Sequence, residues 1–223
     1  MQNENIKYIL VWSGWLRLSH WAIAFGVLFQ ITSAWAIKID HANYDFWYDW
    51  HIMVGQLMLI VMLLRVVLLF TEGASNWRSF FDYKSQLNAI IQMIKFYLSF
   101  ARLPLPNWYA HNPLWKPVYL FMIIVLSGCV ITGMVYNSTF TLAGYSPTEL
   151  HGALATIIIV LSVAHIITAF LHDLKGKGAF VSAIINGHRY FHYSGNKKVE
   201  QTKTVENPSI HIAVDSIKSI KNK

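Results

Sequence analysis

The stretch that decides the fold is LHGALATIIIVLSVAHIITAFLHDLK, residues 150–175, an apolar run long enough to cross a membrane as one helix. It carries His151 near its start and His165 near its end, 14 residues later. On a helix this spacing corresponds to about 21 Å along the axis and to directions within roughly 40° of each other. Ionisable residues inside a spanning helix are costly and usually face the bundle interior, so both histidines are candidate ligands.

The composition is typical of an integral membrane protein. Of 223 residues, 55% are hydrophobic and 13% are charged, a balance that ordinary soluble domains rarely have. The single cysteine, Cys129, excludes an internal disulfide and an all-cysteine iron-sulfur or zinc site. In a membrane protein the net charge of +7 reflects the side of the membrane on which Lys and Arg lie, so we expect no nucleic-acid partner.

The apolar runs predict an all-α fold, an integral membrane four-helix bundle in the lipid bilayer. We expect one transmembrane domain over residues 1–193, followed by a polar cytoplasmic tail over residues 194–223. We expect its spanning helices at about residues 15–37, 51–70, 117–136 and 150–172.

The distribution of basic residues predicts the orientation of the bundle. The loops expected at 38–50 and 137–149 carry only Lys38, whereas the connector at 71–116 and the segment from 173 onward carry most other Lys and Arg. The positive-inside rule then places both termini in the cytoplasm, and we expect a bacterial inner membrane.

Residues 87–103 of the connector predict an amphipathic helix on the cytoplasmic side. Its apolar stripe contains Ile90, Ile91, Ile94, Tyr97, Leu98 and Ala101, with Phe96 and Phe100 outside it. The helix either lies along the inner membrane surface or packs against the bundle.

Four histidines sort by depth into two pairs. His51 opens the second helix and His151 the fourth, so both lie toward the outer surface. His20 lies early in the first helix and His165 late in the fourth, so both lie toward the cytoplasm. Two facing imidazoles per level suit six-coordinate haem iron, whereas zinc prefers clustered ligands. We therefore predict two haem b groups; the alternative is that the histidines only bridge helices by hydrogen bonds.

Further polar residues lie near the cytoplasmic level. Arg17 and Arg65 are candidates for ion pairs with haem propionates, although Arg65 could also snorkel to the membrane surface. His172, Asp173 and Lys175 form a possible quinone site, because quinone reduction consumes protons. A polar helix end that obeys the positive-inside rule would explain the same three residues.

Several stretches together resemble the di-haem cytochrome b subunit of respiratory nickel-iron hydrogenases and the related formate dehydrogenase gamma subunit. They are RLSHWAI at 17–23, HIMVGQLMLIVMLLRV at 51–66, HNPL at 111–114, HGALATIIIVLSVAHI at 151–166 and FVSAIINGHRYF at 180–191. The resemblance implies axial ligation by the same four histidines. It also implies that hydrogenase small and large subunits deliver electrons on the periplasmic side and that quinone receives them. The short loop at 137–149 departs from the longer loops of some hydrogenase subunits.

Two alternatives remain beside this hypothesis. One is a cytochrome b that serves another partner, such as a periplasmic cytochrome c or another respiratory reductase. The other is a haem-free anchor or transporter. Under the main hypothesis the chain is an electron-transfer subunit of an oxidoreductase complex and has no hydrogen chemistry of its own.

Overall fold

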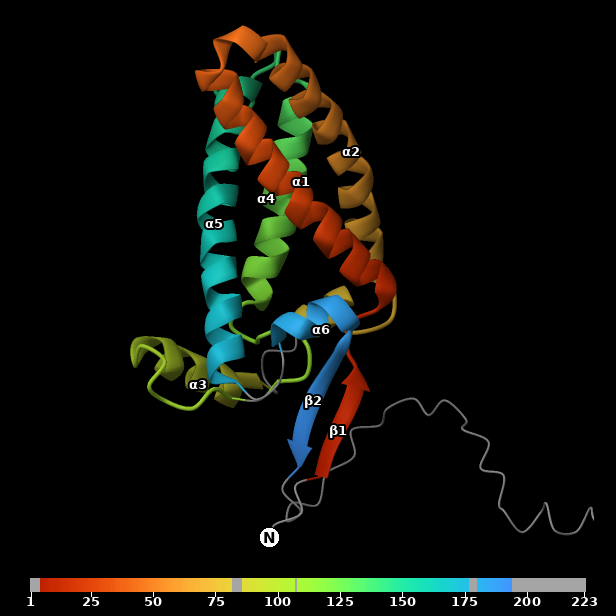
Figure 1. Ribbon diagram of the computed structural model, residues 1–223, viewed down its shortest axis with the longest axis vertical. Coiled ribbons are helices and arrows are strands. Elements are labelled where there is room, and N and C mark those ends of the chain that lie inside the picture. Colours follow the sequence, from red (N-terminus) through yellow and green to blue (C-terminus); the bar gives the residue numbers. More distant parts are fainter. Residues whose placement is uncertain (1–4, 82–85, 107, 177–179, 194–223) are drawn as a thin grey trace, which may run out of the picture. The chain divides into compact units, whose positions relative to one another are not determined.

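The computed structural model describes residues 5–81, 86–106, 108–176 and 180–193 (Figure 1). The chain divides into two units. Ile6–Phe191 holds every described helix, whereas Met1–Asn5 and His192–Lys223 contribute only the outer ends of two strands to the described residues. The predicted tail at 194–223, and Lys84 of the basic connector, lie outside the described residues.

Four helices of the larger unit are long and apolar enough to span a membrane, as the sequence predicts. They are α1 (Gly14–Ile39), α2 (Tyr44–Phe70), α4 (Lys116–Met134) and α5 (Pro147–Lys175). Many of their large apolar side chains are exposed, as expected for residues that face lipid, including Phe25, Ile60 and Ile124. The chain is therefore a multi-pass membrane protein.

The start of α2 differs from the prediction, which placed residues 44–50 in a loop. In the structure these residues form the first two turns of α2. Asp40, after the end of α1, accepts hydrogen bonds from Asn43 Nδ2 and from Trp47 Nε1. These bonds fix the short link, the 3-10 turn η1 (His41–Asn43), and allow the helix to begin earlier than the apolar run suggests.

The helices pack in the order α1, α2, α4, α5. The links from α1 to α2 and from α4 to α5 lie at the same end of the bundle (Figure 1). Gly26 of α1 faces Met58 of α2 so closely that a side chain at Gly26 would clash with the methionine sulfur. In the described part of the chain, α5 packs closely along α4 but not along α1 or α2.

Helix α3 (Leu87–Leu98) confirms a helix in the connector, but its buried face is not the predicted stripe. Met93 and Phe96 are fully buried, and Phe96 was placed off the stripe by the sequence pattern. Ile91, Ile94 and Leu98 of the predicted stripe are instead exposed. The sequence pattern missed this because Met93 and Phe96 meet a separate apolar cluster that includes Ala101, Trp108 and Leu171.

A small strand pair was not predicted. Strand β1 (Asn5–Leu10) pairs with β2 (His188–Tyr193). The short helix α6 (Phe180–Asn186) precedes β2. Elsewhere, the 3-10 turn η2 (Trp77–Phe80) follows α2. The backbone amides of Val11 and Trp12 donate to the carbonyl of Gly187, which lies at a φ of 89°. A side chain there would meet the Trp12 carbonyl oxygen at 2.9 Å, so the junction requires glycine.

A half-buried histidine joins the connector to the bundle. His111 packs its ring against Trp12, Phe80 and Tyr119, with centroid separations of 4.8, 5.0 and 4.8 Å. Its Nδ1 atom is buried and has no hydrogen-bond partner among the described residues. A charged imidazole at this position would therefore be poorly solvated.

We predict that His111 makes the fold acid-sensitive. Burial, with the nearby charges of Arg65 and Lys116, lowers the pKa of His111 from 6.5 to about 3. The unfolded chain gains this proton near pH 6.5 and the folded chain only near pH 3, so the free energy of unfolding falls as pH drops below 6.5. The slope is at most about 1.4 kcal/mol per pH unit. Between pH 7.5 and 5.5, thermal unfolding in detergent should show a smaller loss of stability for His111→Phe than for the wild-type protein. Equal dependence of stability on pH in both proteins would contradict the role of His111.

Candidate functional site

The N-terminal cap of α5 sets the positions of the histidines on this helix. Ser146 accepts a hydrogen bond from the amide of Glu149, whose carboxylate accepts one from the amide of Ser146, and Pro147 occupies the first turn. This capping box stops the helix from starting elsewhere. His151 then lies about one turn inside the helix, and His165 follows 14 residues later.

We call the first histidine pair site 1; it contains His51 of α2 and His151 of α5. The ring centroids lie 6.3 Å apart and the ring planes meet at 78°. Each Nδ1 atom has a close polar neighbour, 2.9 Å away: Ser33 Oγ for His51 and the Cys129 carbonyl oxygen for His151. Both Nδ1 atoms are therefore held by the protein, which leaves the Nε2 atoms for another partner.

We call the second pair site 2; it contains His20 of α1 and His165 of α5. Its ring centroids lie 6.1 Å apart, with an interplanar angle of 66°. His165 is exposed and His20 is half-buried. Within the described residues, neither ring has a hydrogen-bond partner. The structure thus brings together the four predicted histidines as the two predicted combinations, with α5 contributing one ring to each.

The distances within both sites fit a metal ion between two imidazoles. A metal–imidazole bond is about 2.0–2.1 Å and the ring centre lies ~1.1 Å beyond the nitrogen, so two axial imidazoles have centroids roughly 6.3 Å apart. Both sites match this value to within a few tenths of an ångström. Among the described residues no group of three or more His, Cys, Asp or Glu could hold a metal ion. Two-ligand sites of this kind suit a porphyrin, which supplies the other four ligands.

Two features of the helix packing also suit a flat group held between the histidines. A side chain at Gly133 of α4 would meet His151 Cε1 at 3.1 Å, so glycine allows this ring to lie against α4. Because α5 does not pack closely along α1 or α2, each site lies between helices whose main chains stay apart. A flat group can enter between helices only where their packing leaves such a separation.

Arg65 is a buried cation close to site 2. It is 6% exposed, its Nη1 donates to Ser19 Oγ at 3.2 Å, and its guanidinium lies 5.1 Å from the Tyr119 ring centre. No salt bridge to a carboxylate is found for it in the described part of the chain. Arg17, the other predicted propionate partner, instead donates through Nη1 to the Ile185 carbonyl and so ties α1 to α6.

The three residues predicted for quinone binding do not form one group. His172 is buried, and its Nε2 lies 2.7 Å from the Tyr97 hydroxyl. Asp173 accepts a hydrogen bond from the amide of Val181, and Lys175 is exposed at the end of α5. Of the three, only His172 contacts Tyr97.

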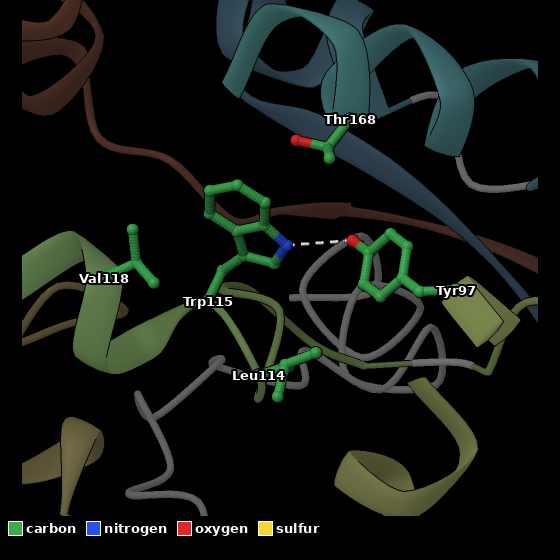
Figure 2. A pocket seen from close by; sticks show the side chains of 5 residues that line it. All are labelled: Tyr97, Leu114, Trp115, Val118 and Thr168. Carbon is green, nitrogen blue, oxygen red and sulfur yellow. Dashed lines mark hydrogen bonds between the residues drawn. The ribbon is translucent and has the colours of Figure 1, made fainter. Parts of the chain in front are cut away.

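A pocket of about 370 Å³ lies beside this contact. Figure 2 shows its lining, with Trp115 Nε1 donating to the Tyr97 hydroxyl at 2.8 Å; the lining residues are Tyr97, Leu114, Trp115, Val118 and Thr168. Thr168 also donates to the His165 carbonyl three residues before it on α5, so one wall of the pocket lies within one helical turn of site 2. Sequence reasoning counted Tyr97 as an apolar stripe residue, because nothing in the pattern relates it to His172, 75 residues away.

Two comparisons relate the chain to known proteins. Over 220 residues, the chain is 23% identical to the "Probable Ni/Fe-hydrogenase B-type cytochrome subunit" of Cupriavidus necator. The aligned region covers 84% of this chain and 89% of that protein. No solved structure matches the chain. The family model described as prokaryotic cytochrome b561 matches residues 11–187, well over half of the sequence. The chain therefore belongs to the prokaryotic cytochrome b561 family.

Proposed function

We propose that this membrane cytochrome b carries electrons between a periplasm-facing Ni/Fe hydrogenase and membrane quinone, using two haem b groups held at sites 1 and 2. The observation that carries the proposal is the presence of two histidine pairs, with centroid separations of 6.3 and 6.1 Å, that share α5. A haem with two axial imidazoles exchanges single electrons and offers no open position to oxygen or substrate.

The chain's own residues set the spacing of the two sites. His151 and His165 are 14 residues apart on one helix, which corresponds to about 21 Å along its axis. His51 and His20 meet them from α2 and α1, so each site joins two helices. Both sites are therefore rigid with respect to α5, which fixes the distance over which electrons move.

Arg65 is proposed to bind a haem propionate at site 2. A buried charge without a partner is strongly destabilising, by several kcal/mol, and the fork of a guanidinium matches a carboxylate. Among the described residues, the partners of Arg65 are neutral: Ser19 Oγ, the Leu16 carbonyl and the ring of Tyr119. Arg17 is proposed for the same role, because its Nη1 donates to the Ile185 carbonyl while its buried Nε has no hydrogen-bond partner among the described residues.

Both termini are proposed to lie in the cytoplasm of a bacterium, in whose inner membrane the bundle resides. The support is the lack of Lys and Arg in the links at 40–43, from α1 to α2, and at 135–146, from α4 to α5, beside the single Lys38 in the last turn of α1. Site 1 then lies toward the periplasm and site 2 toward the cytoplasm. The hydrogenase small and large subunits would bind on the periplasmic side.

The pocket beside site 2 is proposed to bind the quinone head group. Trp115 can only donate its indole N–H, so the Tyr97 oxygen accepts from it and directs its own proton toward His172 Nε2. Burial raises the pKa of Tyr97, so this hydroxyl stays protonated at neutral pH. Tyr97 would give its proton to a bound quinone by turning its hydroxyl from His172 toward the pocket, and His172, once protonated at Nε2, would return a proton to the Tyr97 oxygen.

The hydrogenase partner rests on the name of the 23% identical relative. Purification from native membranes tests it directly. A nickel-containing partner that copurifies with the chain supports the proposal, whereas a c-type cytochrome in its place would assign the chain to the alternative electron partner.

We predict that each site loses its haem independently. His51→Ala should remove about half of the haem by removing an axial ligand from site 1, and His165→Ala should remove the other half from site 2. Haem content is measured from the reduced b-type absorbance per mole of purified protein. His41→Ala is the matched control, because His41 is exposed in the link between α1 and α2. Full haem content in both site variants would refute the proposed ligation.

We also predict that Tyr97→Phe slows quinone reduction by roughly tenfold or more, because a proton donor beside the pocket is lost. Haem content should stay full, since Tyr97 is not a ligand. The rate is measured with reduced protein and a soluble quinone analogue. Tyr109→Phe serves as the control, because Tyr109 is 55% exposed and stacks on Phe191 away from the pocket lining. An unchanged rate of quinone reduction in Tyr97→Phe would contradict the assignment of this pocket as the quinone site.

A further inference from the structure

The two histidine sites differ in how the protein holds their rings. At site 1 both Nδ1 atoms have a polar neighbour at 2.9 Å, whereas neither ring of site 2 has a hydrogen-bond partner among the described residues. Ser33 of α1 supplies the neighbour of His51, and Cys129 of α4 supplies that of His151. Helix α1 contacts His51 twice, through Gln30 Nε2, which donates to the His51 carbonyl, and through Ser33.

The hydrogen bonds available to Ser33 match one tautomer of His51. Ser33 is fully buried, and its Oγ lies 2.8 Å from the Phe29 carbonyl oxygen and 3.2 Å from that of Gln30. When Nε2 of neutral His51 binds haem iron, as in the proposed function, Nδ1 carries the ring proton and donates it to the Ser33 oxygen. The one hydroxyl proton of Ser33 is then directed to these two carbonyls, which can only accept. A neutral imidazole that is protonated at Nδ1 has its free electron pair on Nε2.

His151, the other ring of site 1, has the same tautomer. His151 Nδ1 lies 2.9 Å from the Cys129 carbonyl oxygen, which can only accept. His151 is thus also protonated at Nδ1 and has its free electron pair on Nε2. Both rings of site 1 are prepared in the tautomer that binds metal, and the acceptors make them stronger electron donors.

We propose that Ser33 is a positioning residue for site 1, which acts through His51 by fixing its tautomer and orientation and lowers the reduction potential of the haem bound there. The inference rests on the proposed function, because it concerns haem held by the same two histidines. Site 2 lacks such acceptors in the described structure and serves as an internal reference.

The test compares Ser33→Ala, which removes the hydroxyl, with Ser33→Cys, which keeps a similar volume but is a weak acceptor. Thr32→Val is the matched control, since Thr32 is the exposed neighbour and its hydroxyl bonds only to the Leu28 and Phe29 carbonyls. The midpoint potential of each haem is measured by spectroelectrochemistry, together with the electron paramagnetic resonance spectrum of the oxidised protein. The component that His51→Ala removes identifies site 1.

Both Ser33 variants should shift the site 1 midpoint upward and alter its resonance signal, or lose haem from site 1 alone, while site 2 and Thr32→Val stay at wild-type values. Wild-type values in both variants would overturn the inference. The inference would also be overturned if Ser33→Cys restored wild-type values that Ser33→Ala had changed, since side-chain volume would then be the cause. An equal change at site 2 would overturn it as well. Wild-type protein without b-type haem would instead overturn the proposed function itself.

Discussion

The separation of the two imidazole rings within each pair, 6.3 Å at site 1 and 6.1 Å at site 2, is the constraint on which the rest of the structure depends. One helix, α5, supplies a ring to both sites, so α1 and α2 must bring their histidines to the same two levels. The capping box that starts at Ser146 fixes the register of α5. Gly133 admits the ring of His151 against α4, and the contacts of Gln30 hold the backbone of α2 at His51.

This arrangement places polar groups in an apolar bundle whose own residues satisfy them only in part. Arg65 is buried beside neutral partners, and a side-chain atom of Gln30 and one of Arg17 are buried without a hydrogen-bond partner in the described structure. Each such group costs free energy unless a ligand compensates it. A group that adds carboxylates and bridges the facing imidazoles would therefore stabilise the bundle as it binds. Cofactor binding and folding are expected to be coupled in this protein.

Hydrophobic runs were sufficient to predict the spanning helices, and helical rise was sufficient to predict which of the four histidines lie together. Uninterrupted apolar sequence marked α4 and α5 to within a few residues, whereas the aromatic and acidic residues before His51 hid the first turns of α2. Depth needs only the distance along an axis. Features that depend on the rotation of one helix against another were missed, such as the contact of Ser33 with His51 and the burial of Phe96. Pairing of β1 with β2 was missed because the two strands lie at opposite ends of the chain.

The most direct test of the account is the electron paramagnetic resonance spectrum of the oxidised, purified protein, together with its haem-to-protein ratio. The account predicts about two haems per chain, both low-spin and six-coordinate, because each site provides two facing imidazoles. Ring planes at 78° and 66° should make both signals strongly anisotropic. A protein with no haem or a single one, or with a high-spin haem that has an open coordination position, would contradict it.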